Sequence, residues 1–149
     1  MSAFLAFLHH LAAFALVAAL IVEIVLIRQE ITTATVRRLA LADMVIGMSA
    51  AAVLAVGLLR VFYFEKGAAF YFHNAAFIAK LTAFIVVALL SIYPTMKFIS
   101  WRKSEAPRAD AATLRTIRRL LSLELLGVVL ILLFAALMAR GIGFILGPG

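Results

Sequence analysis

Residues 4–27 comprise the sequence FLAFLHHLAAFALVAALIVEIVLI, and this stretch decides the class of fold. It contains one acidic residue, Glu23, and neither lysine nor arginine. About 20 apolar residues in a helix are enough to cross the hydrocarbon core of a bilayer. Because no Lys or Arg precedes the stretch, it lacks the charged start of a signal peptide, and we expect it to remain in the mature protein. The sequence therefore predicts a transmembrane helix here.

Three further stretches, 44–63, 75–97 and 120–140, have the same character. The chain of 149 residues is 66% hydrophobic with a mean hydropathy of +1.16, which excludes an ordinary water-soluble domain. The absence of cysteine excludes disulfides, thiolate catalysis and iron–sulfur ligation. We predict an all-α integral membrane four-helix bundle that forms a single domain over residues 1–149. Its fourth helix, 110–140, should begin with a cytoplasmic extension.

Lysine and arginine are distributed unevenly between the predicted helices, and this sets the expected orientation. The middle connection, 64–74, contains Lys66 alone, whereas the regions around the other two connections are strongly basic. Their basic residues are Arg28, Arg37, Arg38, Lys97, Arg102, Lys103, Arg108, Arg115, Arg118 and Arg119. By the positive-inside rule these residues face the cytoplasm, with both termini outside. We therefore predict a multi-pass protein of the bacterial inner membrane whose arginines contact anionic lipids and not nucleic acid.

Local features refine the prediction for three of the helices. Asp110 is placed to cap the fourth helix. The small residues of 47–57 favour close helix packing in lipid, so we expect the second helix to be the most enclosed. Pro94 should kink the third helix, and the hydroxyl of Ser91 or Thr95 is placed to satisfy the carbonyl that the proline leaves free.

Ionisable side chains within hydrocarbon are costly, so they are the candidates for function. Their positions along the helices sort them into an outer and an inner layer. The outer layer comprises His9, His10, Arg60, His73 and Lys80. His9 and Lys80 both lie about 8 Å inside the outer ends of their helices, at 1.5 Å per residue. In the inner layer, Glu23 and Glu124 are expected to pair with the cytoplasmic arginines.

Helical phase also separates the two neighbouring histidines. His9 lies within about 40° of Glu23 on its helix, whereas His10 points away by about 100°, so His9 is the better candidate for the interior. His73, Lys80 and Ser91 share one face of the third helix by the same reasoning. Imidazoles beside cations fit haem, because neutral imidazole ligates iron and cations bind propionates.

Other readings of the outer layer remain. Zinc or copper would also accept His9, His10 and His73, although Glu65 is the only nearby carboxylate and thiolates are absent. The structural alternative is that these polar side chains simply reach the membrane interface or form hydrogen bonds there. The aromatic segment around His73 fits either the wall of a macrocycle site or an interfacial belt.

Four longer segments resemble a known family. They are FLHHLAAFALVAALIVEIVLIR, RRLALADMVIGMSAAAVLAVGLLRV, EKGAAFYFHNAAFIAKL and YPTMKFISWR, and they look like a bacterial family of uncharacterised predicted four-helix membrane proteins. An early histidine, a Gly-Leu near the outer end of the second helix and the F-x-x-K-L of the third more distantly resemble the HemJ-type protoporphyrinogen IX oxidases. That resemblance implies a small haem-binding membrane protein in which His9, with His10 as the rival, and Lys80 are the functional residues.

The leading hypothesis is accordingly a haem b-binding protein with a redox role, extending to HemJ-like oxidation of protoporphyrinogen. His9 and Lys80 would be catalytic, His10 and His73 would be further ligands, and Arg60 and Lys66 would face the propionates. A porphyrin or quinone would be its partner. The alternative is a small permease or exporter subunit, or a membrane assembly partner without a cofactor. Four helices are few for a solitary transporter, so the permease reading predicts a homo-oligomer.

Overall fold

A computed structural model describes residues 2–64, 74–105 and 107–142 of the chain. Four helices in this part are long and apolar enough to cross a membrane, and none of the described residues lies in a strand. The helices are α1 (Ser2–Leu26), α2 (Thr33–Leu59), α4 (Ala75–Arg102) and α5 (Ala111–Ala139). A π-helical turn, η1 (Arg60–Phe64), extends α2. The predicted all-α membrane protein with four spans is confirmed, whereas its orientation in the membrane stays a prediction from the charge pattern.

Helix α2 begins eleven residues before the predicted start at 44, so the first connection is much shorter than expected. The oxygen of the Thr32 side chain accepts a hydrogen bond from the backbone N–H of Thr35 at 3.2 Å and caps the helix. The first turns of α2 are amphipathic, with Leu39 buried and Arg37 exposed. A search for uninterrupted apolar runs misses such turns. Helix α4 likewise continues beyond the predicted end at 97 to Arg102.

Helix α5 begins where the sequence predicts. The carboxylate of Asp110 accepts hydrogen bonds from the backbone N–H of Thr113 at 3.0 Å and from its hydroxyl at 2.6 Å. These two bonds stabilise the ionised carboxylate and lower the pKa of Asp110 below its ordinary value. The helix thus starts in the polar region of Arg115 and Arg119 and continues into the apolar span.

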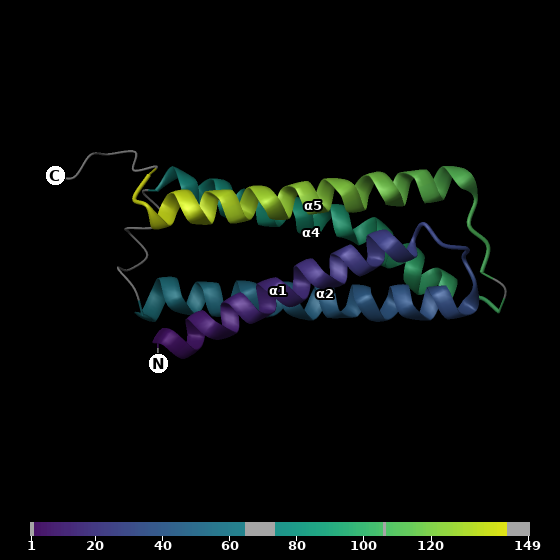
Figure 1. The fold of residues 1–149 in the computed structure, drawn as a ribbon, viewed down its shortest axis with the longest axis horizontal. Coiled ribbons are helices and arrows are strands. Elements are labelled where there is room, and N and C mark those ends of the chain that lie inside the picture. Colours follow the sequence, from purple (N-terminus) through teal and green to yellow (C-terminus); the bar gives the residue numbers. More distant parts are fainter. Residues whose placement is uncertain (1, 65–73, 106, 143–149) are drawn as a thin grey trace.

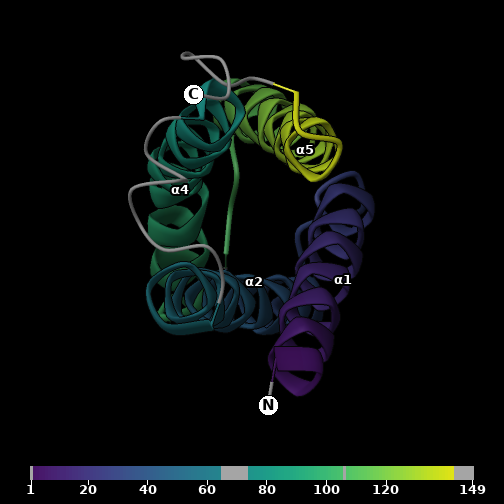
Figure 2. The same ribbon diagram turned by 90° about the vertical axis from the view of Figure 1, so that its left-hand side faces the viewer.

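The four helices form two antiparallel hairpins, α1 with α2 and α4 with α5 (Figure 1). The hairpins meet where α2 contacts α4 and where α1 contacts α5, so the helices surround a common axis (Figure 2). Contacts within each hairpin are far more extensive than contacts between the hairpins. The start of α1 and the end of α5 lie at the same end of the bundle (Figure 1).

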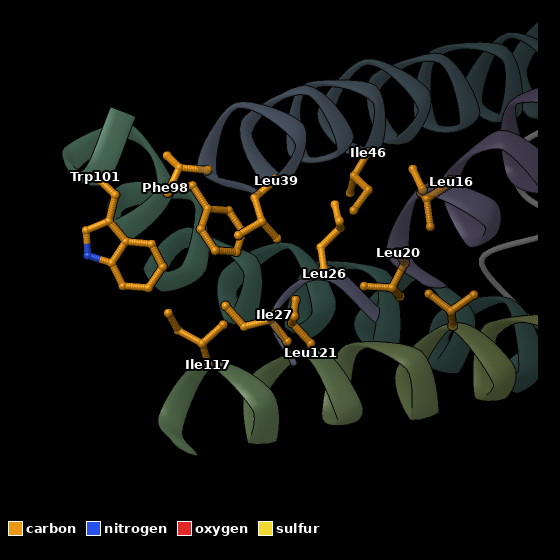
Figure 3. Close-up of a cluster of buried hydrophobic side chains, with 13 residues drawn as sticks. Leu16, Leu20, Leu26, Ile27, Leu39, Ile46, Phe98, Trp101, Ile117 and Leu121 are labelled. Atoms are coloured by element: carbon orange, nitrogen blue, oxygen red, sulfur yellow. The ribbon is translucent and has the colours of Figure 1, made fainter. Parts of the chain in front are cut away.

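The hydrophobic core lies toward the opposite end, where the helices meet the basic connections. Its side chains come from all four helices, as Figure 3 shows for Leu39, Phe98 and Ile117. The rings of Phe98 and Trp101 lie 6.0 Å apart, centroid to centroid, at a tilted angle. At the same end, Nη2 of Arg118 donates a hydrogen bond to the carbonyl of Ile27 at 3.3 Å and so ties α5 to the end of α1. This end of the molecule is therefore the well-packed one.

Helix α2 is enclosed to the same degree as α1 and α5, with 17% of its apolar stretch buried, and to a greater degree than α4, so the expectation that it is the most enclosed helix holds only against α4. Of its small residues, Ser49 is buried and Gly57 lies close to His9, but Gly47, Ala51 and Ala55 are exposed. A methyl group added at Gly47 would meet no atom within 4 Å. Only part of the small face of α2 therefore packs within this chain.

Helix α4 runs through Pro94. Neither Ser91 nor Thr95 donates its hydroxyl to the carbonyl that the proline leaves free, contrary to the prediction. The Ser91 hydroxyl donates to the carbonyl of Ala88 at 2.9 Å. The Thr95 hydroxyl instead donates to Oδ1 of Asp43 on α2, at 2.7 Å. Thr95 thus makes a polar contact between the two hairpins and does not repair its own helix.

Helices α4 and α5 approach closely at Gly127 of α5, where an added Cβ would overlap the side chain of Val87 on α4. Valine is stiff at χ1 in a helix and cannot easily turn away. We expect Gly127→Ala to destabilise the protein by about 1–3 kcal/mol through overpacking. Unfolding of the detergent-solubilised protein measures this change.

Gly47→Ala is the matched control, since its methyl group meets nothing, and should be neutral. Adding Val87→Ala to Gly127→Ala should restore much of the lost stability, because the second change removes the overlapping methyl groups. Equal stability of Gly127→Ala and the wild type would show that the two helices do not need this close approach.

Candidate functional site

A small apolar pocket, here called the outer pocket, lies between the hairpins toward the end where α1 begins. It has a volume of about 140 Å³. Its polar side chains are His9 from α1 and Lys80 from α4, and Gly57 of α2 and Phe77 of α4 also line it. The structure therefore brings together the two residues that depth along the helices had placed at one level.

The imidazole of His9 packs against the backbone of α2. A Cβ added at Gly57 would lie 3.3 Å from Cε1 and 3.7 Å from Nδ1 of His9, so a larger residue there would require the ring to move by a few tenths of an ångström. Nδ1 is buried and has no hydrogen-bond partner among the described residues, and the backbone of Val53 lies close enough to interact with the His9 ring. The Nδ1 side of the ring thus faces α2.

His10 lies on the outside of the bundle, as its helical phase predicts. Its side chain is exposed, and its Nδ1 lies 2.6 Å from the carbonyl of Ala6, to which it donates in the matching tautomer. The rings of His9 and His10 are perpendicular, with centroids 6.0 Å apart. His10 is therefore not part of the outer pocket.

Two cations accompany His9. Nζ of Lys80 lies 5.5 Å from the centroid of the Phe77 ring, within the range of a cation–π interaction. The charges of both Lys80 and Arg60 act on the His9 imidazole. Arg60 is the first residue of the π-helical turn η1, a rare element that is frequent at functional sites. The sequence pattern gave no sign of this turn.

The predicted residues His73, Lys66 and Glu65 lie outside the described residues. Within the described part of the chain, no group of three or more His, Cys, Asp or Glu side chains is arranged to hold a metal ion. The zinc or copper reading of His9, His10 and His73 thus finds no ligand set in that part.

The predicted pairing of the inner carboxylates with arginines is wrong. Glu23 and Glu124 are each only 1% exposed, and Oε1 of each is buried without a hydrogen-bond partner. Each interacts electrostatically with the carboxylate of Asp43, and Glu23 also with that of Glu124. Arg28 is exposed at the end of the bundle. The inner layer is therefore a group of three carboxyl side chains that, within the described residues, has no ion-pair partner.

A second space, here called the middle cavity, lies between the hairpins and has a volume of about 490 Å³. Its polar lining residues are Asp43, Ser91, Thr95 and Glu124, and the rest of its lining is apolar apart from backbone. It shares lining residues with the outer pocket, namely Ala13, Val53, Phe84, Ile131 and Leu132. An apolar space therefore runs from the outer cations to the carboxyl layer.

Sequence reasoning missed the roles of Asp43 and Thr95. Asp43 fell in the predicted first connection because α2 was expected to begin at 44. The capping position of Thr32 was the signal that could have placed Asp43 inside a helix. No local pattern reveals the contact between Thr95 and Asp43, which are 52 residues apart in the sequence.

Comparison with known proteins gives a family but no described function. The family described as "Predicted membrane protein (DUF2214)" matches residues 1–143. No curated protein and no solved structure matches the chain. No comparison matched the chain to the HemJ-type oxidases, so the resemblance to them stays an expectation. On a match that covers nearly its whole length, the chain belongs to the DUF2214 family of predicted membrane proteins.

Proposed function

We propose that this protein binds haem b at the outer pocket and has a redox role in the membrane. The observation that supports the proposal most is the position of His9, whose imidazole lines an apolar pocket beside Lys80 and within the field of Arg60. An imidazole flanked by two cations matches a group that has a metal centre and an anionic rim.

The environment of the His9 ring fits a residue that would hold the haem iron. Ligating histidines generally use one ring nitrogen for the metal and direct the other toward a backbone carbonyl or carboxylate. Nδ1 of His9 faces the backbone of α2 near Val53 and Gly57, where no ligand has room. Nε2 is then the nitrogen that remains for a group in the pocket.

The cations and the phenylalanine rings of the pocket fit the propionates and the macrocycle of haem. Lys80 and Arg60 would hold the propionates, because anions are stabilised beside ammonium and guanidinium groups in a site of low dielectric. Phe77 and Phe84 line the pocket and exclude water from it. Lys66, which is also predicted to face the propionates, lies outside the described residues.

The outer pocket is large enough for haem only together with the middle cavity. Pockets that enclose organic ligands measure about 300–1,000 Å³, and the outer pocket alone is smaller than this at about 140 Å³. The middle cavity continues it through five shared lining residues and has a volume of about 490 Å³. A macrocycle held by His9 would therefore need the room of both spaces, including the part that Phe84 lines.

Bound haem would supply one-electron redox chemistry, and the residues of this chain would position it. His9 would fix the iron, and Lys80 would neutralise an anionic rim. The HemJ resemblance makes oxidation of protoporphyrinogen the expected reaction, with a quinone as the electron acceptor. Formation of fluorescent protoporphyrin by the purified protein with an added quinone would support that step.

An absorption spectrum of the protein purified in detergent from haem-replete cells tests the proposal. We expect a Soret band in the wild type and its loss in His9→Ala. His10→Ala is the matched control, because His10 is exposed on the outside of the bundle, and it should keep the band. Absence of the band in the wild type, or its survival in a folded His9→Ala variant, would contradict the proposal.

A further inference from the structure

The middle cavity has a polar layer that the outer pocket does not use. Glu124 of α5 is 1% exposed, lines the cavity and has a buried Oε1 with no hydrogen-bond partner. Asp43 of α2 lines the same cavity from the other hairpin. A buried acceptor without a partner costs about 1–3 kcal/mol, so its retention in a cavity points to a ligand that completes it.

The carboxyl groups of this layer favour a positively charged ligand. Glu23 adds a third carboxyl within electrostatic reach of the other two. Among the described residues no basic side chain forms an ion pair with any of them. Arg37 and Arg38 line a neighbouring groove that also touches Asp43, yet the hydrogen bond that Asp43 accepts comes from Thr95. A cation would be attracted to these carboxyl groups, and an anion would be repelled by their ionised forms.

The apolar lining and the size of the rest of the cavity favour a ligand with an apolar organic body. Apart from Asp43, Ser91, Thr95 and Glu124, its lining is aliphatic, aromatic or small, with Phe84, Val128 and Leu20 among the lining residues. Its volume of about 490 Å³ suits an organic molecule and is far larger than a metal ion needs. A hydrated inorganic cation would gain nothing from these apolar walls.

The outer pocket disfavours a cation, and this separates the two sites. His9 and Glu23 are fourteen residues apart on α1, which corresponds to about 21 Å along the helix axis. Lys80 and Arg60 act at the His9 level, whereas the carboxyls lie at the other level. A cation in the continuous space therefore has its lowest electrostatic energy beside Glu124 and Asp43.

We infer that the middle cavity binds a lipophilic organic cation, a protonated or quaternary amine with an apolar body. The cationic centre lies between the carboxylates of Glu124 and Asp43, with Thr95 holding one oxygen of Asp43 in place. The apolar body lies against the walls toward Phe84. The charged residues of this site, Glu124 and Asp43, differ from those of the haem proposal and carry the opposite charge. The apolar walls near Phe84 are common to both proposals, so haem and the cation would compete for that part of the space.

The test uses the full chain in lipid nanodiscs and equilibrium dialysis with tetraphenylphosphonium as the probe. Tetraphenylborate has the same shape with a negative charge, and empty nanodiscs correct for partition into lipid. We expect saturable binding of the phosphonium and none of the borate. Glu124→Gln should weaken phosphonium binding about tenfold or more, since one charge contact is lost.

Two control variants separate this site from other effects. Glu30→Gln makes the same change on an exposed carboxylate and should leave the affinity unchanged. His10→Ala, a change on the outside of the bundle, should also leave it unchanged. Asp43→Asn decides the matter if Glu124→Gln does not fold, and it should also weaken binding. Equal binding of the borate, undiminished binding by folded Glu124→Gln or Asp43→Asn, or weaker binding by His10→Ala would overturn the inference.

Discussion

Replacing Phe98 by alanine is expected to cause the largest loss of stability of any single change in the core. Phe98 is 0% exposed and lies among Leu39, Ile117 and Trp101 at the well-packed end of the bundle. Phe→Ala in a buried site costs about 3–5 kcal/mol in water-soluble proteins. In lipid the transfer of apolar surface contributes little, but the lost contacts remain, so we expect about 3 kcal/mol.

Unfolding of the detergent-solubilised variant measures this loss. Phe62→Ala is the matched control, because Phe62 is exposed on the lipid-facing surface near the opposite end and should change stability little. A loss at Phe98 no larger than the loss at Phe62 would show that the basic end of the bundle is not the region that holds the helices together.

Replacing Glu23 by methionine is expected to stabilise the protein. Glu23 is 1% exposed, its Oε1 has no hydrogen-bond partner, and it lies near the carboxyls of Asp43 and Glu124. Methionine has a similar shape and removes both the unsatisfied oxygen and the repulsion. We expect a gain of about 1–3 kcal/mol, the usual cost of an unpaired buried polar group.

A loss of stability in Glu23→Met would mean that the Glu23 carboxyl has a partner that the described residues do not provide. Glu30→Met serves as the comparison, because that carboxylate is exposed and its removal should have almost no effect. A gain at Glu23 together with weaker cation binding would be the pattern of a residue kept for function at the expense of stability.

The spans could be predicted from the sequence because each depends on a local property, namely a run of apolar side chains long enough to cross a bilayer. The convergence of His9 and Lys80 could also be anticipated, since depth along a helix follows from a fixed rise per residue. The start of α2 could not be found from apolar runs alone, because its first turns alternate arginine with buried Val36 and Leu39.

Features that depend on which helices contact one another could not be predicted from the sequence. The exposure of Gly47 and the tight contact of Gly127 differ only in what faces each glycine. The fate of Glu23 and Glu124 was mispredicted for a related reason. Nearby arginines in the sequence suggested ion pairs, but both carboxyl groups are buried while Arg28 and Arg38 are exposed.

The concentration of the core at the basic end has a mechanical consequence. The two hairpins are joined at this end, which can serve as a pivot, by side chains such as Leu39 and Phe98 that come from different hairpins. A small rotation about that pivot would widen the gap near His9 without disturbing the packed end. A hydrophobic molecule could then enter sideways from the lipid, between the two hairpins. It would not have to pass through the membrane surface between the connecting loops.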